Sequence, residues 1–264
     1  MSWDSLGGTG VMGALSVYDT RRFGMRVARM SVRAEEHDVR GAAREIMRHW
    51  ERLNVRIAVV RWPLHAAAVA DHLTDAGMTV VPADRLAYWG ADLFASPPVG
   101  SDSAVVPLSA QPELADAVAE ATAETFRGYR NHYEASECFP AEDVLAGYVE
   151  WARRCIDTRP EHVVVAVDGD EVTAFATTTP LADGQTLEVD LAGTVEARRR
   201  EGWYSRLVDG LLSHAEALGF DRVVISTQEW NRPVQAVWAR AGFRGFAAFE
   251  TVHLTRTPAD DADT

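Results

Sequence analysis

The chain has 264 residues, and all 26 of its basic side chains are arginine, against 39 acidic ones. The lack of lysine excludes Schiff-base and phosphate-loop lysine chemistry, and the net charge of −13 argues against a nucleic-acid partner. With two cysteines, no apolar run of membrane length and no leader-like pattern in residues 1–13, the sequence predicts a cytoplasmic protein that is neither membrane-bound nor built on disulfides.

The first third of the sequence alternates between strand and helix patterns. After a glycine-rich start expected to be frayed, we expect strands over 23–32, 55–60 and 79–89 and helices over 38–53 and 64–77. We interpret residues 1–95 as an incomplete first domain. Two prolines and a glycine then indicate a linker over 96–103.

After the linker the order of strands and helices starts again, which predicts a second domain over 104–257 and a mixed α/β fold. An acidic tail, 258–264, follows. The expected helices cover 112–125, 141–155, 203–218 and 233–241, and the expected strands 104–107, 162–167, 171–178, 186–195, 222–227 and 246–254.

The segment from 188 to 243 is the most informative part of the sequence. A strand ends at Val195, and Gly202 then opens a long amphipathic helix. Glycine at a strand-to-helix turn lets the backbone approach a ligand closely, and the unpaired amides of the helix start attract an anion. Arg198, Arg199 and Arg200 at this turn predict a local basic patch.

This segment resembles the acetyl-CoA-binding core of the GCN5-related N-acetyltransferase (GNAT) superfamily. That family carries Arg/Gln-x-x-Gly-x-Gly/Ala at its long helix, and further on an Asn, a Tyr and a Gly-Phe pair. The corresponding residues here are Arg199-x-x-Gly202-x-Tyr204, then Asn231, Trp238 and Gly242-Phe243. The resemblance implies the GNAT fold over 104–254, with acetyl-CoA or another acyl-CoA as co-substrate and the amine of a small molecule as acceptor.

The resemblance also implies which residues bind CoA. Backbone at Val195 would pair with the pantetheine arm, and the turn and helix start would hold the pyrophosphate. The implied CoA-binding residues are Val195, Arg199, Arg200, Gly202, Tyr204, Ser205 and Asn231.

A second, shorter resemblance lies near the N-terminus. Asp19-Thr20-Arg21-Arg22-Phe23-Gly24 is similar to a segment of sugar-nucleotide acetyltransferases of the dTDP-fucosamine type. It implies that residues 1–95 form a partial GNAT-like domain and that the acceptor is an amino sugar linked to a nucleotide. Such a domain would extend the catalytic sheet, contribute to the acceptor pocket or form a homodimer surface.

Two residues depart from the family pattern. Tyr204 replaces a Gly or Ala, which is tolerable if its side chain points away from the pyrophosphate. Trp238 replaces a tyrosine that protonates the CoA thiolate in many members, and an indole N–H is no usable acid. Two alternatives stay open: transfer of another acyl group or from a carrier-protein thioester, and a degenerate binding or regulatory module.

Three residues are candidates for the general base. Glu188 and Asp190 lie two apart on a strand and should share a face, where their repulsion would raise one pKa. Alternatively they form a solvated polar face. His132, in the loop over 126–139, is the third candidate, because a pKa near about 6.5 suits a base without tuning; a surface histidine is the alternative.

We expect the acceptor to be bound by residues of that loop and of the strand before Asn231. These candidates are Tyr129, Arg130, Tyr133, Thr227 and Trp238, although Trp238 is also a core candidate and Arg130 could be a solvated charge. The histidines show no spacing typical of metal ligands, so we expect no metal.

Overall fold

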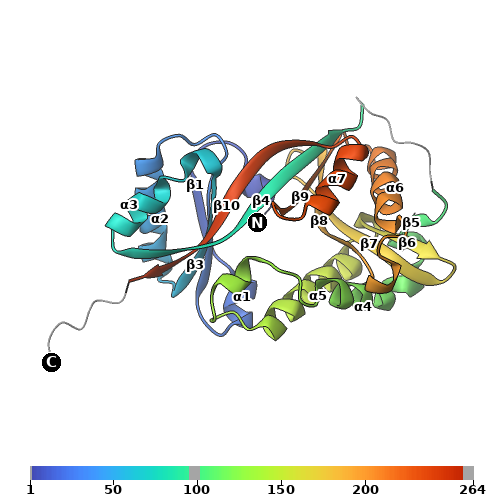
Figure 1. The fold of residues 1–264 in the computed structure, drawn as a ribbon, viewed down its shortest axis with the longest axis horizontal. Helices are drawn as coiled ribbons and strands as arrows, with labels where there is room; N and C mark the ends of the chain where they lie inside the picture. Colours follow the sequence, from blue (N-terminus) through green and yellow to red (C-terminus); the bar gives the residue numbers. More distant parts are fainter. Residues whose placement is uncertain (1, 95–101, 258–264) are drawn as a thin grey trace. The chain divides into compact units, whose positions relative to one another are not determined.

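The computed structural model describes residues 2–94 and 102–257, which form two compact units (Figure 1). The first unit takes its residues from 1–86, 130–140 and 247–264, and the second from 87–129 and 141–246. The expected domains were consecutive stretches of chain, whereas each unit combines separate segments. The expected linker 96–103 lies outside the described residues apart from its last two, and the expected tail 258–264 lies outside them entirely.

The first unit contains a sheet in the order β1-β2-β3-β10. Strands β2 and β3 are parallel, and the β1–β2 and β3–β10 pairs are antiparallel. The elements are β1 (Val11–Leu15), α1 (Val17–Arg22), β2 (Val27–Val32), α2 (Val39–Leu53), β3 (Ile57–Pro63), α3 (Val69–Asp75), the start of β4 (Met78–Asp92) and most of β10 (Arg244–Arg256).

One face of this sheet is apolar, and the opposite, polar face carries charged and polar side chains beside apolar ones such as Ile57 and Val59. Ala28, Met30 and Val32 on β2 alternate onto the face that α2 and α3 cover, where they join Ile46 of α2 in one core (Figure 1). The opposite face carries Arg29, Arg61, Thr251 and His253, which alternate with these apolar positions. On β3 and β10, the apolar side chains that join the core beneath α2 and α3 are Ala58, Val60, Trp62, Val252 and Leu254.

The second unit has helices on both faces of its sheet. Its strands follow the order β4-β9-β8-β7-β6-β5, with β8 and β9 parallel and the pairs from β8 to β5 antiparallel. The elements are β5 (Val105–Pro107), α4 (Ala115–Phe126), α5 (Ala141–Thr158), β6 (Val163–Asp168), β7 (Glu171–Pro180), β8 (Thr186–Thr194), α6 (Trp203–Ala217), β9 (Arg222–Gln228) and α7 (Arg232–Arg240).

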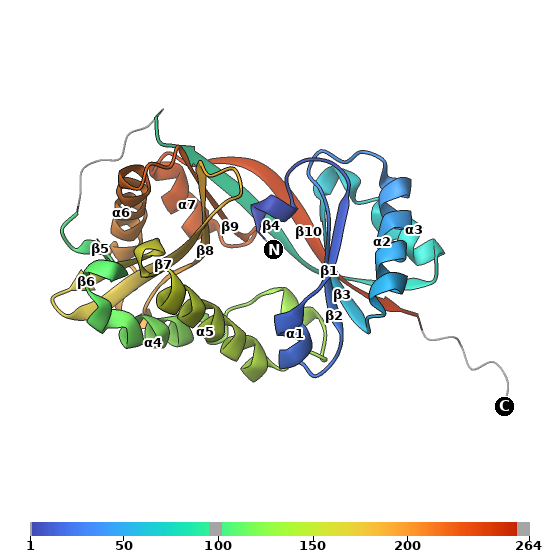
Figure 2. The same ribbon diagram turned by 180° about the vertical axis from the view of Figure 1, so that it is seen from behind.

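Two apolar clusters fix these layers. Leu207 and Leu211 of α6 and Trp238 of α7 pack on one face of the sheet, and Val118 of α4 and Ile156 of α5 pack on the other (Figure 2). Short 3-10 turns connect the elements of both units: Trp3–Ser5, Leu64–Ala66, Leu108–Ala110, Pro112–Leu114, His132–Ala135, Pro160–His162 and Glu196–Arg198.

The elements deviate from the sequence prediction where backbone geometry or long-range pairing intervenes. The strand expected from residue 23 starts at Val27, because α1 ends at Arg22 and Gly24 turns the chain with a φ of 61°. The N-terminal residues expected to be frayed include β1, which pairs with β2, and Leu6, which is fully buried. Among the described residues no helix is both long and apolar enough to cross a membrane.

Candidate functional site

In the second unit, the parallel strands β8 and β9 are paired only at their beginnings. Their register runs from Thr186 opposite Arg222 to Val189 opposite Ile225. Strand β8 continues to Thr194 and β9 to Gln228, and the described residues show no further pair between these two strands. Backbone groups of β8 beyond Val189 are therefore available on the side of β9.

The antiparallel pairing with β7 shows which backbone groups these are. The Val195 N–H donates to the Thr173 carbonyl at 3.0 Å, which makes this a hydrogen-bonded pair. Because such pairs alternate with non-bonded ones, the backbone groups of Ala192 and Thr194 point away from β7. The Val195 carbonyl also accepts from the Arg198 N–H at 3.0 Å, so both backbone groups of Val195 are engaged. The expected pantetheine contact of Val195 therefore fits Ala192 and Thr194 better.

Helix α6 begins without a side-chain cap. Gly202 stands at the N-cap position with a φ of 87°, in the left-handed region that favours glycine. The Arg206 N–H donates to the Gly202 carbonyl at 3.1 Å, as the first intrahelical bond. The amides of Trp203, Tyr204 and Ser205 have no acceptor within the helix, and they carry the positive end of its dipole. This geometry suits a phosphate group.

The arginines before α6 do not form the expected basic patch. Arg198 makes ion pairs with Asp168, with Glu171 at 3.1 Å and with Glu201 at 2.9 Å. Arg199 lies 3.9 Å from Glu196. The four carboxylates outnumber the three guanidiniums, so the helix amides, rather than a surplus of positive charge, are the main attraction for an anion here.

Beyond the last β8–β9 pair, strand β8 contains a bulge at Asp190. Thr177 of β7 faces Leu191, whereas Thr178 faces Val189, so Asp190 is the extra residue. Leu187 and Val189 pack toward α6, and Glu188 between them therefore points to the opposite face. Asp190 reaches the same face, where its Oδ2 accepts from the Thr179 hydroxyl at 2.5 Å.

The two carboxylates differ in their surroundings. Glu188 is 5% exposed and lies within the paired part of β8. Burial raises the pKa of Asp190 to about 6, while the hydrogen bond from Thr179 and the charge of Arg159 lower it. The direction of the predicted shift is correct for Asp190, but burial, not repulsion from Glu188, is its main cause. A carboxylate with this pKa is a base that is mostly deprotonated at neutral pH.

The two residues that depart from the family pattern contact each other. The Trp238 indole N–H donates to the Tyr204 hydroxyl oxygen at 3.1 Å. Trp238 is 1% exposed and belongs to the core between α6, α7 and the sheet, so its expected contact with an acceptor does not fit this burial. Burial raises the pKa of the Tyr204 phenol, which therefore stays protonated at neutral pH.

The end of β9 carries a hydrogen-bonded group of polar residues. The Asn231 side-chain amide donates to Thr227 Oγ1 at 3.1 Å, and it does not cap the helix α7 that follows. The Tyr129 hydroxyl donates to the Gln228 side chain and lies 3.4 Å from Thr227 Oγ1. The structure thus brings together three residues expected from the sequence, Tyr129, Thr227 and Asn231.

The remaining candidates from the loop over 126–139 are Arg130, His132 and Tyr133, and they belong to the first unit. Arg130 is exposed, whereas His132 is 6% exposed and lies 3.3 Å from His253 through its Nδ1. Burial, followed by the charges of Arg29 and Arg61, lowers the pKa of His132 well below its usual value. His132 is therefore not a surface histidine, and its pKa is not the unperturbed value on which its candidacy as a base rested.

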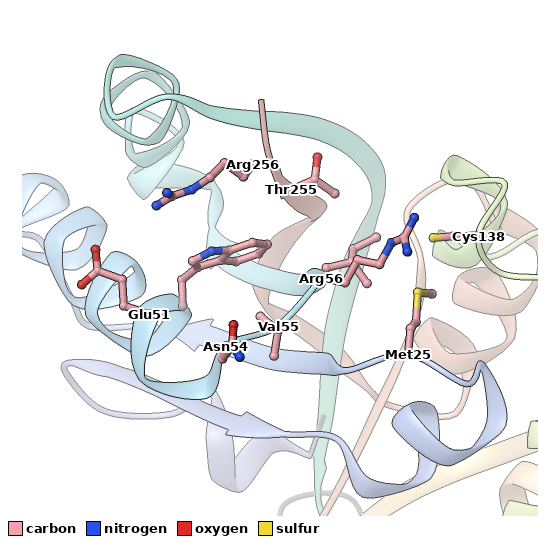
Figure 3. Close-up of a pocket in the computed structure, with 10 residues that line it drawn as sticks. Met25, Glu51, Asn54, Val55, Arg56, Cys138, Thr255 and Arg256 are labelled. Carbon is pink, nitrogen blue, oxygen red and sulfur yellow. The ribbon is translucent and has the colours of Figure 1, made fainter. Parts of the chain in front are cut away.

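The first unit also contains an open pocket of about 670 Å³ (Figure 3). It lies where α2 ends and β3 begins. Two arginines line it, Arg56 just before β3 and Arg256 at the end of β10. None of the residues predicted to act in catalysis or binding lines it. Its lining residues are Met25, Trp50, Glu51, Asn54, Val55, Arg56, Ile57, Cys138, Thr255 and Arg256.

Several residues of the site were not predicted from the sequence. Gln228, at the end of β9, is 7% exposed and accepts from Tyr129. Thr179 connects Asp190 to Arg159, whose Nη2 donates to the Thr179 hydroxyl at 3.1 Å. These contacts join residues far apart in the chain, and no local spacing signals them. Within the described ranges, no three His, Cys, Asp or Glu side chains are grouped as a metal ion would require.

Comparisons with known proteins agree with this geometry. The family model described as "Acetyltransferase (GNAT) family" matches residues 120–243. That range contains the diverging strands, the bulge and the start of α6. Among proteins of curated function, none matches the sequence significantly.

Solved structures share the fold across nearly the whole chain. A GCN5-related N-acetyltransferase from Sphaerobacter thermophilus is 14% identical, with a TM-score of 0.62, over 95% of this chain and 78% of its own. A glucosamine N-acetyltransferase region of a fungal multi-domain β-N-acetylglucosaminidase is 8% identical, with a TM-score of 0.57, over 92% of this chain and 31% of its own. A tandem GNAT protein from the clavulanic acid pathway is 14% identical, with a TM-score of 0.51, over 89% of this chain and 76% of its own. The expected fold class, a mixed α/β GNAT fold, is confirmed.

Proposed function

We propose that the chain, whose residues 120–243 match the family model described as "Acetyltransferase (GNAT) family", transfers an acyl group, above all acetyl, from CoA to the amine of a small polar acceptor. The observation that carries the proposal is the combination of an uncapped helix start at Gly202 with two parallel strands that separate after Val189 and Ile225.

In this proposal the second unit binds CoA through its backbone. The amides at the start of α6, from Trp203 to Ser205, hold the pyrophosphate, which needs no lysine. The backbone groups of Ala192 and Thr194 pair with the amides of the pantetheine arm, as a further strand would. Asn231, hydrogen-bonded to Thr227, presents its remaining polar atoms beside the start of α7.

Asp190 is the residue that we propose as the proton acceptor. It stands one position beyond the last β8–β9 pair, and its pKa of about 6 leaves it charged at neutral pH. It removes a proton from the acceptor amine as the nitrogen attacks the thioester carbonyl, directly or through one water. Glu188, on the same face of the sheet, is the alternative proton acceptor.

Tyr204 is the residue that we propose to protonate the departing thiolate. Because an indole only donates, the Tyr204 oxygen accepts from Trp238 and its own O–H proton is directed elsewhere. Trp238 thereby positions the hydroxyl instead of acting as the acid. A phenol that stays protonated at neutral pH is suited to donate to a thiolate as the carbon–sulfur bond breaks.

The acceptor that we propose first is an amino sugar, free or linked to a nucleotide. Its support is the short N-terminal resemblance around Asp19 and the description of the fungal region that shares the fold, which names glucosamine. A cytoplasmic location and a homodimer remain predictions of the sequence.

Calorimetric titration with acetyl-CoA, followed by thiol release across a panel of small amines that includes amino sugars, tests this function. We expect saturable binding of acetyl-CoA and acceptor-dependent release of the thiol. Absence of binding at millimolar acetyl-CoA would contradict the proposal. Binding without thiol release from any amine would favour a regulatory module or a different acyl donor.

A further inference from the structure

The polar face of the first unit's sheet is buried rather than solvated. Thr251 and His253 on β10 are fully buried, and Arg61 on β3 is 7% exposed. Residues 130–140 pack on this face, where the Ser136 hydroxyl lies 2.6 Å from His253 Nδ1 and His132 Nδ1 lies 3.3 Å from His253 Nε2. A charge in such surroundings is costly unless something neutralises it.

The carboxylate of Asp19, next to this face, is already paired with two arginines. Asp19 Oδ2 accepts from Arg29 Nε at 2.7 Å, and its Oδ1 lies 3.3 Å from Arg22 Nη1. The Tyr133 hydroxyl also donates to Asp19 Oδ1, at 3.1 Å, and it contacts Arg29. Burial would raise the pKa of Asp19, but Arg29 and the hydroxyl groups of Ser16 and Tyr133 outweigh burial and lower the pKa. One carboxylate thus serves two arginines.

Arg61 has no such counter-charge. Its Nε donates to Thr251 Oγ1 at 3.1 Å, and among the residues that the structure describes this is its one hydrogen bond, with no carboxylate in an ion pair. The neighbouring carboxylate on β10, Glu250, accepts from the Trp62 indole on the opposite face instead. The two terminal nitrogens of Arg61 therefore keep their hydrogen-bonding capacity.

The neighbours of Arg61 are polar but uncharged at neutral pH. Burial, together with Arg29, Arg61 and His253, lowers the pKa of His132 well below its usual value. Burial and Arg29 lower the pKa of His253 to about 4. Neutral imidazoles offer an N–H donor without adding a negative charge. The contacts described above thus involve one carboxylate, that of Asp19, and the three guanidiniums of Arg22, Arg29 and Arg61.

We propose that Arg61, on the face of the sheet where His132 and His253 contact each other, forms a binding site in the first unit for the carboxylate or phosphate group of a small ligand. A guanidinium binds either group through two parallel hydrogen bonds, and the anion supplies the counter-charge that Arg61 lacks. The site is separate from the start of α6 and does not depend on the proposed acyl transfer.

Thermal unfolding of the full chain, in chloride buffer with added inorganic phosphate or malonate, tests this site. We compare the wild type with Arg61→Met, Arg61→Lys and the control Arg56→Met, which removes an exposed arginine of the same unit. The wild type and Arg56→Met should be stabilised with a Kd of about 1 mM or tighter. Arg61→Met should bind at least about tenfold more weakly, and Arg61→Lys should lie between them. Any anion bound at α6 contributes equally to all four proteins.

A second comparison separates binding from a structural role. Without added anion, Arg61→Met should be at least as stable as the wild type, because it removes a buried charge without a partner. The His132 and His253 ring signals in NMR spectra should shift with the anion in the wild type only. Preference for malonate assigns a carboxylate ligand, and preference for phosphate a phosphate ligand. An equal anion response in the wild type and Arg61→Met, or a variant destabilised equally with and without anion, would overturn the proposal.

Discussion

In each compact unit, a helix joins two parallel neighbouring strands: β2–α2–β3 in the first unit and β8–α6–β9 in the second. The two helices have 15 residues each and pack their apolar faces on their own sheets. What differs is the start of the helix and the end of the strand pairing.

In the first unit the helix start is closed by carboxylates. Asp38 Oδ1 accepts from the Gly41 N–H at 2.9 Å, and Glu36 accepts from the amides of Gly10 and Asp38. An anion would meet negative charge there. In the second unit, Gly202 stands at the corresponding position and contributes no side chain.

The two strand pairs also differ in how far their pairing extends. Pairing of β2 with β3 continues to Ser31 opposite Arg61, near the ends of both strands. Pairing of β8 with β9 ends at Val189, and the bulge at Asp190 follows at once. The same local architecture is therefore closed in the first unit and open in the second, where we propose that CoA binds. A capping carboxylate and the length of one strand pairing account for the difference.

The largest effect on activity is expected from Asp190, which follows the last β8–β9 pair and has no counterpart in the first unit. Asp190→Asn should lower kcat by about 100- to 10,000-fold with little change in acetyl-CoA affinity, because it removes the base. In the wild type, kcat/KM should fall as the pH drops through about 6, the pKa of Asp190. Steady-state kinetics as a function of pH checks both, with Glu188→Gln as the matched variant. An unchanged pH profile in Asp190→Asn would assign the base to another group.

The same substitution should change stability in the opposite direction. The folded-state pKa of Asp190 lies above its ordinary 3.8, so the folded chain binds more protons than the unfolded chain between these values. The favourable contribution is present at low pH and is lost as the pH rises through about 6. Asp190→Asn should therefore stabilise the fold at pH 7 by up to about 3 kcal/mol and by less near pH 4, as denaturant unfolding can measure.

Closing the open helix start should abolish most of the CoA affinity. Gly202→Asp introduces the carboxylate that caps α2 and strains a left-handed backbone position, so we expect about 100-fold weaker binding of acetyl-CoA. Gly219→Asp is the control, because Gly219 has a φ of 84° at the other end of α6 and equally open surroundings. Similar affinity losses in both variants would point to helix strain rather than to a lost anion site.

A smaller effect is expected from the tyrosine at this helix start. Tyr204→Phe keeps the ring in the core but removes the hydroxyl that accepts from Trp238. We expect kcat to fall by about 10- to 100-fold with the Kd of acetyl-CoA unchanged. Trp238→Phe should give a milder loss, since the hydroxyl remains. Equal kcat values in the wild type and Tyr204→Phe would exclude Tyr204 as the proton donor.

The smallest effect should follow from opening the closed element. Asp38→Ala removes the cap of α2 and should destabilise the first unit by about 1 kcal/mol, measured by thermal unfolding. It should neither create a second CoA site nor alter the affinity of the first, because β2 and β3 stay paired. A gain in CoA stoichiometry would show that the cap alone keeps this element closed.

The open element could largely be predicted from the sequence, because its signals are local. The strand end, Gly202 and the amphipathic helix lie within one continuous segment, and the structure places the helix within a residue of its expected bounds. The shared face of Glu188 and Asp190 followed from strand alternation, although the bulge was not foreseen. The hydrogen bonds of the Val195 backbone could not be foreseen, because they depend on the pairing with β7 and on the turn before α6.

The surroundings of side chains in the first unit could not be predicted in this way. The burial of His132 depends on residues 130–140 packing with β3 and β10, which are far apart in the chain. The pairing of β3 with β10 joins residues near 60 to residues near 250, and no periodicity within one segment encodes it. The three arginines before α6 predicted a basic patch. Asp168 and Glu171, on either side of the β6–β7 turn, form ion pairs with Arg198 and neutralise its charge.

We expect acetyl-CoA to bind at the start of α6 and not at the equivalent start of α2. Calorimetric titration of the wild type, Gly202→Asp and Asp38→Ala with acetyl-CoA tests it most directly. We expect one site per chain in the wild type, the same site in Asp38→Ala and about 100-fold weaker binding in Gly202→Asp. Full affinity in Gly202→Asp, or two sites per wild-type chain, would contradict it.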